Sequence, residues 1–521
     1  MDISKKFLKT LRPVESVFYL ASLVLAVRLL VRCAQNFQSL DTIAFADGKL
    51  WQSLVIVITV HIIFIAAAWI YSRLWPAITV LSFYAAILLS FPFLWILNVF
   101  ILKIPDGIFL WSVATLWILP AVIQTERFKE WLGMSVSWRS WLTWPNALIT
   151  LWFIHAVTLF LRFNFIADRR PFGDESTLWY TAAARMITHG FLSAHAIQYD
   201  GRGMQPFGVP FIAALPAKLF GSMETATIYF MPVAIIFFLL LFLNSIKHER
   251  YMLFFFLVAV FTTFHNRSWM SELCYKLVYG EGLSMIFFLA VSVQLFQLEK
   301  DRHLGKAQFL FLSFLIGLLA LVKWPLAVLV PVFYAMMAFL YLKIDPRNLE
   351  KWTVAAIGFA IAFVPQVLWN LFNQSHDFLT PGLSITTGEL LNRLSAPNIP
   401  ALKLIVGDIY TQYDSFFYYA VLSFIFVFFT FRSWEYLRLM SIMILGILVT
   451  FFYAYIFIYS TVEGDWGSAL RYYMPAVLAL YFFGSIGLSQ CVKNIEGKSW
   501  SPWVISGLCL GILVLVMVKM F

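Results

Sequence analysis

Charged residues are scarce in this chain. Only 12% of its 521 residues are Asp, Glu, Lys or Arg, whereas 61% are hydrophobic; soluble proteins have about 25% charged residues. Several water-facing domains would need far more polar surface, so a soluble multidomain protein is excluded. Intrinsic disorder is excluded too, because 54 Phe, 22 Tyr and 20 Trp are more than a solvated chain carries.

Cysteine is rare as well. The chain has only Cys33, Cys274, Cys491 and Cys509, with no Cys-x-x-Cys pair, which argues against a disulfide framework and a zinc site. The net charge of +10 comes from 37 Lys and Arg against 27 Asp and Glu. These basic residues lie mainly between apolar runs, where they indicate membrane topology and not a nucleic-acid partner.

What the sequence does have is long apolar runs. About 20 apolar residues cross roughly 30 Å of hydrocarbon as a helix, and open strands cannot satisfy their backbone in lipid. We therefore predict an all-α polytopic membrane protein with about 15 transmembrane helices. The predicted spans are 14–34, 51–72, 75–101, 107–124, 141–164, 224–246, 251–264, 282–298, 307–322, 325–342, 352–371, 416–431, 438–459, 471–490 and 502–518.

Lysine and arginine in the connections orient these helices, because cytoplasmic loops are enriched in them. The N-terminal tail carries three lysines and Arg12, which predicts a cytoplasmic N-terminus. Alternate connections after the tail each carry at least one basic residue. The non-cytoplasmic side then has two long outer loops, 165–223 and 372–415.

This alternation depends on residues 206–221, PFGVPFIAALPAKLFG. The segment is short and contains Pro206, Pro210 and Pro216, so we predict a re-entrant or surface-lying piece. If it crossed the membrane instead, Lys247 and all later inner loops would change side.

The first long outer loop holds an acidic pair, Asp174 and Glu175, directly before a helix-like run. Leu178, Ala182 and Met186 fall four residues apart in that run, which is typical of an amphipathic helix at the membrane surface. One interpretation is structural: the acids cap the helix and complement its dipole. The other is functional: one acid is a general base that takes the proton from an acceptor hydroxyl.

Two cations are expected on the same side as this pair. Lys323 lies in the tight outer turn between the runs 307–322 and 325–342, and Arg471 begins the run 471–490. Either alone can be a snorkelling cation at an interface. Together at the outer edge of a bundle, facing an acidic loop, they suit an anionic lipid head group.

At these residues the sequence resembles the C-type membrane glycosyltransferases (the GT-C superfamily), in particular the protein O-mannosyltransferase and lipid A aminoarabinose transferase branch. GDESTLWYTAAARMITHG resembles the family's acidic pair and the aromatic, alanine-rich helix after it. AALPAKLFG resembles the Pro-containing segment that ends in Leu-Phe-Gly. LALVKWPLAVLVP and LRYYMPAVLAL resemble the later Lys-x-Pro and Arg-Tyr-x-x-Pro positions. The likeness covers residues 141–490.

Such enzymes transfer a sugar from a polyprenyl or dolichyl phosphate carrier at the outer face. The resemblance implies an inverting transfer to a hydroxyl of a lipid, glycan or protein acceptor, with Asp174 as general base and Glu175 beside it. No cofactor is expected; a divalent ion shared by Asp174 and Glu175 stays an open alternative that the sequence does not support. The implied ligands of the donor phosphate are Lys323, Arg471 and Arg202. Further residues expected at the cavity are Tyr180, Arg185, Glu281 and Tyr472.

The resemblance also divides the chain into three parts. Residues 1–124 hold extra N-terminal helices with no assigned role, 141–490 form the catalytic module, and 491–521 form a C-terminal helix. The chain departs from the family at the re-entrant piece, where Gln205 precedes the proline in place of the family's frequent Lys or His. Arg202 is the replacement cation in this interpretation.

Three other functions remain open from the sequence: a lipid or polysaccharide transporter or flippase, a polymerase or ligase that uses a lipid diphosphate, and an inactive scaffold. A transporter would need polar groups near mid-membrane, and in the central spans only His61 and His155 stand out. Polar residues gather at one face, which favours interfacial transfer chemistry. The expected location is a bacterial inner membrane in preference to the endoplasmic reticulum.

Overall fold

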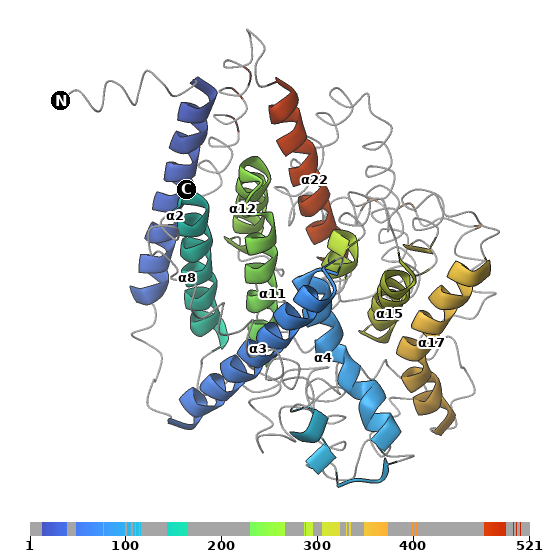
Figure 1. The fold of residues 1–521 in the computed structure, drawn as a ribbon. Helices are drawn as coiled ribbons and strands as arrows, with labels where there is room; N and C mark the ends of the chain where they lie inside the picture. The colour runs from blue at the N-terminus through green and yellow to red at the C-terminus, as the bar shows by residue number, and fades with distance from the viewer. Residues whose placement is uncertain are drawn as a thin grey trace.

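The structure is a computed structural model in which all the secondary structure of the described residues is helical (Figure 1). The long helices in this part of the chain are α2 (Pro13–Gln38), α3 (Gly48–Leu74), α4 (Val80–Leu97), α8 (Trp144–Asn164), α11 (Met231–Ile246), α12 (Arg250–His265), α15 (Lys306–Val322), α17 (Leu349–Phe372) and α22 (Met474–Ile495). The described residues are 13–38, 48–76, 78–98, 102–105, 108–109, 111–113, 115, 143–164, 230–265, 286, 288–294, 305–322, 330, 333–334, 349–372, 395, 399, 403, 474–495, 504, 507 and 511.

Three helices begin side by side around one buried aromatic ring. Phe18, near the start of α2, has its ring centroid 5.2 Å from that of Trp144 in α8 and 4.9 Å from that of Tyr251 in α12. Phe18 is only 1% exposed, and both pairs meet edge to face, a favourable aromatic geometry. α2, α8 and α12 are therefore parallel. We call the face at which they begin the first face, and the opposite one the second face.

Two helices end at this first face. α11 ends at Ile246, and Glu249 N donates a hydrogen bond back to the Ile246 carbonyl over 2.9 Å in the tight turn that leads into α12. Lys493, in the last turn of α22, forms an ion pair with Glu249. α11 and α22 thus run antiparallel to α2, α8 and α12, and begin at the second face.

α3 and α4 form a hairpin whose turn lies at the first face. Only nine residues, 39–47, separate α2 from α3, too few for a helical span, so α3 begins at the second face and ends at the first. α4 starts with a capped turn: Thr79 Oγ1 accepts a hydrogen bond of 3.1 Å from Ser82 N, which satisfies a free donor of the first turn.

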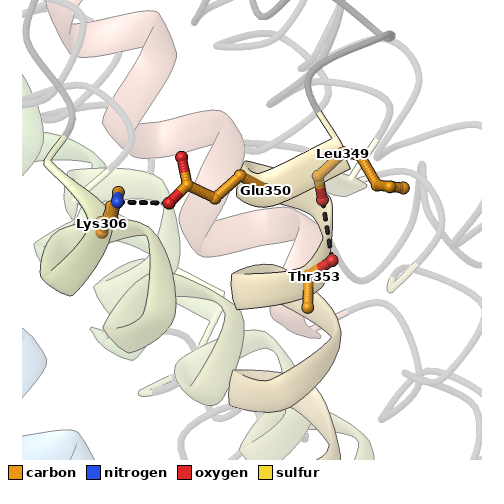
Figure 2. A network of polar contacts seen from close by, with 4 residues as sticks. All are labelled: Lys306, Leu349, Glu350 and Thr353. Atoms are coloured by element: carbon orange, nitrogen blue, oxygen red, sulfur yellow. Dashed lines mark hydrogen bonds and ion pairs between the residues drawn. The ribbon is translucent and has the colours of Figure 1, made fainter.

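α15 and α17 lie parallel and begin together at the first face. Lys306 forms an ion pair with Glu350, and Thr353 Oγ1 donates to the Leu349 carbonyl over 2.8 Å in the first turn of α17 (Figure 2). The two charged side chains are 65% and 64% exposed, so the pair contributes little to stability, about 0–1 kcal/mol. Phe83 in the first turn of α4 packs 4.9 Å from Phe311 of α15, which places the starts of α4 and α15 at the same face.

Small residues let α15 and α17 approach closely. A Cβ on Gly358 would lie 2.3 Å from the Leu310 carbonyl oxygen, and one on Gly317 would lie 2.6 Å from the Cβ of Ala362. Each helix thus presents two small residues four apart, Ser313 and Gly317 on α15 and Gly358 and Ala362 on α17. This small-xxx-small arrangement is typical of helix pairing in membranes, where backbone proximity replaces the hydrophobic effect.

Three of the described helices are long and apolar enough to cross a membrane, namely over Phe18–Gln35, Leu54–Leu74 and Trp144–Leu161. Shorter apolar helices cover Pro232–Ile246, Arg250–Val260 and Lys306–Leu319. The exposed face of α2 is itself apolar, with Leu20 57% and Leu23 60% exposed. An integral, multi-pass, helical membrane protein follows from these features, in agreement with the composition.

The predicted spans match all nine of the long helices in the described part, with shifted ends. The largest difference is the predicted span 75–101, which is α4, Val80–Leu97. It is shorter because Thr79 caps its start and because Asn98, after its end, bonds to Ile104 and closes a turn. Of the predicted span 282–298, residues 286 and 288–294 are described. The predicted spans that lie wholly or largely outside the described residues are 107–124, 325–342, 416–431, 438–459 and 502–518.

The arrangement of helix ends yields a labelling prediction. In a variant without native cysteines, a cysteine at exposed His248, in the first-face turn between α11 and α12, and one at exposed Lys103, beyond the second-face end of α4, will react with a membrane-impermeant maleimide from opposite sides of sealed vesicles. Detergent-opened vesicles, in which both sites react, are the control. Labelling of both from one side contradicts the arrangement.

Candidate functional site

The residues predicted from the sequence to carry the chemistry lie outside the described part of the chain, so their mutual distances stay predictions. This holds for the extra cavity residues as well as for the acids and cations. The residues are Asp174, Glu175, Tyr180, Arg185, Arg202, Glu281, Lys323, Arg471 and Tyr472.

The helix ends that adjoin these residues are described, and they share one face. α8 ends at Asn164, ten positions before Asp174, and α15 ends at Val322, immediately before Lys323. α22 begins at Met474, three positions after Arg471. By the orientations above, all three described ends are directed toward the second face. The predicted acids and cations thus follow or precede described helix ends on the same side of the bundle.

A buried polar cluster joins α3, α4 and α11 at Phe230, the first described residue of the helical stretch that contains α11. His61 Nε2 lies 3.0 Å from the carbonyl oxygen of Phe230, and Tyr84 Oη lies 2.8 Å from His61 Nδ1. Both His61 and Tyr84 are 0% exposed. We call His61, Tyr84 and the Phe230 carbonyl the His61 junction. Tyr84 lies 23 residues and Phe230 169 residues from His61 in the sequence, so the junction links distant segments.

The hydrogen bonds of the His61 junction have defined directions. A carbonyl oxygen only accepts, so His61 Nε2 carries a proton and donates to Phe230. A neutral imidazole has one such proton, and Nδ1 therefore accepts the bond that Tyr84 Oη donates. The Ala234 carbonyl, 3.5 Å from Tyr84 Oη, is a weaker second contact. Both ring nitrogens of His61 are thus used within the protein.

Aromatic rings enclose the His61 junction. The centroid of the His61 ring lies 4.4 Å from that of Phe230, 6.0 Å from that of Phe64 and 6.1 Å from that of Phe237. Phe237 also contacts Phe153 of α8, at 6.4 Å. In such apolar surroundings a hydrogen bond is stronger than in water, and an unsatisfied partner is costlier. The junction therefore lies where α3, α4, α8 and α11 pack together.

A second buried polar cluster lies at the first face and is structural. Gln294 Oε1 accepts from Thr79 N over 3.0 Å and from Ser82 Oγ over 2.9 Å. These two bonds complete the cap of α4 and tie that helix to the segment 288–294. Gln294 is 1% exposed, so this cluster is closed to solvent and to substrate.

The end of α4 forms a rigid turn at the second face. The Asn98 side chain donates to the Ile104 carbonyl over 2.8 Å and accepts from Ile104 N over 3.0 Å. Lys103, inside this turn, has φ 52°, a left-handed conformation that is uncommon for residues other than glycine. Asn98 is 1% exposed, so its amide is committed to holding the turn.

Sequence reasoning found only part of the His61 junction. His61 stands out in the sequence as a polar residue within an apolar span, but Tyr84 and Phe230 do not. A tyrosine in an apolar run is equally typical of a lipid interface or a core, and a backbone carbonyl has no sequence signal. The pairing depends on contacts between distant segments, which a single sequence does not encode in readable form.

No group of three or more His, Cys, Asp or Glu side chains that could hold a metal ion occurs among the residues described here. The acidic pair 174–175 lies outside them. Comparison with known proteins adds no relative: no protein-family model, no curated protein and no solved structure matches the chain.

Proposed function

We propose that this protein is a glycosyltransferase that moves a sugar from a polyprenyl-phosphate or dolichyl-phosphate carrier to a hydroxyl acceptor at the second face of the membrane. The single observation that supports the proposal is the common face of the helix ends next to Asp174, Lys323 and Arg471. The sequence motifs that resemble the GT-C superfamily would be scattered on opposite sides if these ends alternated.

The chemistry needs both charges on one side of the bilayer. The acceptor oxygen attacks the anomeric carbon and the carbon–oxygen bond to the carrier phosphate breaks, which inverts the anomeric centre. Asp174 takes the hydroxyl proton as general base, with Glu175 beside it. The carrier leaves as a lipid phosphate whose added negative charge Lys323 and Arg471 stabilise. Arg202 is a third candidate for this role.

The second face is the non-cytoplasmic one in this proposal. Described basic side chains at the first face include Arg73, Lys247, Lys306, Lys351 and Lys493, and cytoplasmic loops are enriched in such residues. α8 runs toward the second face and α11 runs away from it, in keeping with a segment 206–221 that makes no net crossing.

Transport is less well supported than transfer. A transporter uses polar groups inside its spans to hold cargo. The two ring nitrogens of His61 are bonded to Phe230 and Tyr84, and Gln294 is bonded to the start of α4. These buried groups serve helix packing, which favours chemistry at the rim over passage through the middle.

The proposal is tested with purified protein in liposomes and a panel of polyprenyl-phosphate-linked sugars, by measuring the release of free polyprenyl phosphate. We expect Arg471→Ala to lower the initial rate at least tenfold, because a charge-assisted hydrogen bond to the leaving phosphate is lost, and Arg471→Lys to retain part of it. Arg73→Ala is the matched control, since Arg73 lies at the first face over the Trp69 ring. Absence of release by the wild type with every donor, or full activity of Arg471→Ala, contradicts the proposal.

A further inference from the structure

We infer that the turn after α4 binds the head group of an anionic phospholipid at the second face, with the phosphate at Lys103 and the acyl chains over the exposed apolar side chains beside it. We call Asn98 and residues 102–105 the Lys103 turn. It belongs to the extra N-terminal helices, which have no part in the proposed transfer, so the inference does not rest on the proposed function.

The Lys103 turn lies at the level of the lipid head groups. α4 starts at the first face and has 18 residues, which rise about 27 Å and so cover most of a hydrocarbon layer about 30 Å thick. The turn follows its far end (Figure 1). Arg73 and Lys493 lie at the opposite face. The bias that collects basic residues at one face of a membrane protein accounts for those two and does not account for Lys103.

One buried side chain holds the backbone around Lys103. Lys103 N donates to the Asn98 carbonyl over 2.7 Å. The Asn98 side chain donates to the Ile104 carbonyl over 2.8 Å and accepts from Ile104 N over 3.0 Å. Asn98 is 1% exposed, so these bonds are shielded from competing water. The position of the lysine backbone is therefore fixed before any ligand arrives, which reduces the entropy lost on binding.

The backbone at Lys103 would suit a glycine better than a lysine. Its φ of 52° is in the left-handed region, which costs an L-residue free energy and costs glycine almost none. Such conformations persist where the surroundings impose them, and they are common at ligand sites. The Lys103 side chain is exposed and has no hydrogen-bond or ion-pair partner in the described part of the chain. Its charge is thus available to a ligand.

Exposed apolar side chains surround this charge. Phe109 N donates to the Pro105 carbonyl over 3.0 Å, so a helical stretch starts directly after the turn. Phe109 is 4% exposed and packs inward, whereas Ile108 is 62% and Trp111 53% exposed. Tryptophan is typical of the boundary between head groups and hydrocarbon. The exposed apolar side chains next to Lys103 in the sequence are Leu102, Ile104, Ile108 and Trp111.

A single cation next to apolar surface fits a lipid phosphate better than a soluble anion. The ammonium group gives a charge-assisted hydrogen bond to a phosphate oxygen, and one such group in water holds a free anion weakly. A phospholipid is already concentrated at this level of the membrane, and its chains cover the apolar side chains. A zwitterionic head group brings its own cation. The charge of Lys103 therefore favours lipids with net negative charge.

Fluorescence quenching by brominated lipids tests the site locally. A bimane label is placed on Ile108→Cys in a variant without native cysteines, reconstituted with phosphatidylglycerol or phosphatidylcholine brominated in the acyl chains. Mixtures of the two give their relative binding constant at the label. We expect phosphatidylglycerol to be favoured about threefold to fivefold, the effect of one lysine near an anionic head group. The control label is on Ile62→Cys in the middle of α3, 54% exposed, where we expect no preference.

Substitutions of Lys103 separate its charge from its place in the turn. Lys103→Gly suits the left-handed backbone, so its melting temperature should not fall, yet the preference at residue 108 should drop to within about 1.5-fold of equality because the charge is gone. Lys103→Gln should lose the preference too, and it decides the matter if the glycine variant does not fold. Lys103→Arg should keep a preference of at least about twofold.

Three results would overturn the inference. The first is equal quenching by the two lipids at residue 108 in the parent, and the second is a preference that survives in Lys103→Gly or Lys103→Gln. The third is the same preference at residue 62, which would indicate a general attraction of anionic lipid to the basic protein. Inorganic phosphate at constant ionic strength should leave the preference unchanged. If it abolishes the preference, Lys103 binds soluble anions and the lipid assignment is wrong.

Discussion

Asp174→Asn is expected to lower kcat for polyprenyl phosphate release by at least about 100-fold, which is within the range that a general base contributes. The amide has nearly the shape of the carboxylate and still accepts a hydrogen bond, but it cannot take the proton of the attacking hydroxyl. In the proposed mechanism the cations bind the donor, so KM for the donor should change little. Steady-state rates with a radiolabelled sugar donor give both constants.

Glu175→Gln is the matched control for this result. The two acids are neighbours, so both substitutions remove one negative charge from the same place. Only the base is irreplaceable, and we expect Glu175→Gln to retain at least about tenfold more activity than Asp174→Asn. Undiminished turnover in Asp174→Asn, with the protein folded, would remove the base from the mechanism. Equal losses in the two variants would indicate a helix-capping role for the pair.

Gly358→Ala is expected to lower the free energy of unfolding by about 1–3 kcal/mol or more, the cost of overpacking a tight contact. The added Cβ would lie 2.3 Å from the Leu310 carbonyl oxygen and 3.0 Å from the Cβ of Ser313. The first of these is backbone and cannot rotate away, so α15 and α17 must separate. Reversible unfolding in mixed micelles of a mild detergent and a denaturing detergent measures the change in the free energy of unfolding.

Gly511→Ala is the control for this second prediction. It makes the same substitution at a glycine whose added Cβ would meet nothing within 4 Å. Its stability should be unchanged, or slightly raised if the higher helix propensity of alanine contributes. If Gly358→Ala is as stable as Gly511→Ala, the close approach of α15 and α17 is wrong.

The sequence by itself predicted the nine long helices in the described part of the chain and the direction in which each of them runs. Apolar runs such as 352–371 locate α17, Leu349–Phe372, because the length and hydrophobicity of a span are local properties. Basic residues such as Lys306 and Lys493 gather at one face, where each meets an acid, Glu350 and Glu249 respectively. The charge near the end of a span is also a local property of the sequence, and it sets the orientation of that helix in the membrane.

For the candidate site, local sequence predicts residue types and one side of the membrane, and no more. Asp174, Lys323 and Arg471 are separated by more than a hundred residues, and whether they converge depends on which helices are neighbours. The described helix ends next to these residues are directed toward one face. Whether these residues act together in one site is what the Asp174 and Arg471 variants test.

Only the tertiary structure decided which helices touch and which polar groups pair. Apolar helices in lipid resemble one another, and their neighbours are selected by shape and by a few buried hydrogen bonds. Gly317 and Gly358 matter because α15 and α17 face each other, and His61 matters because Tyr84 and Phe230 lie beside it. These contacts join segments far apart in the chain, and their energies exist only after the helices have packed.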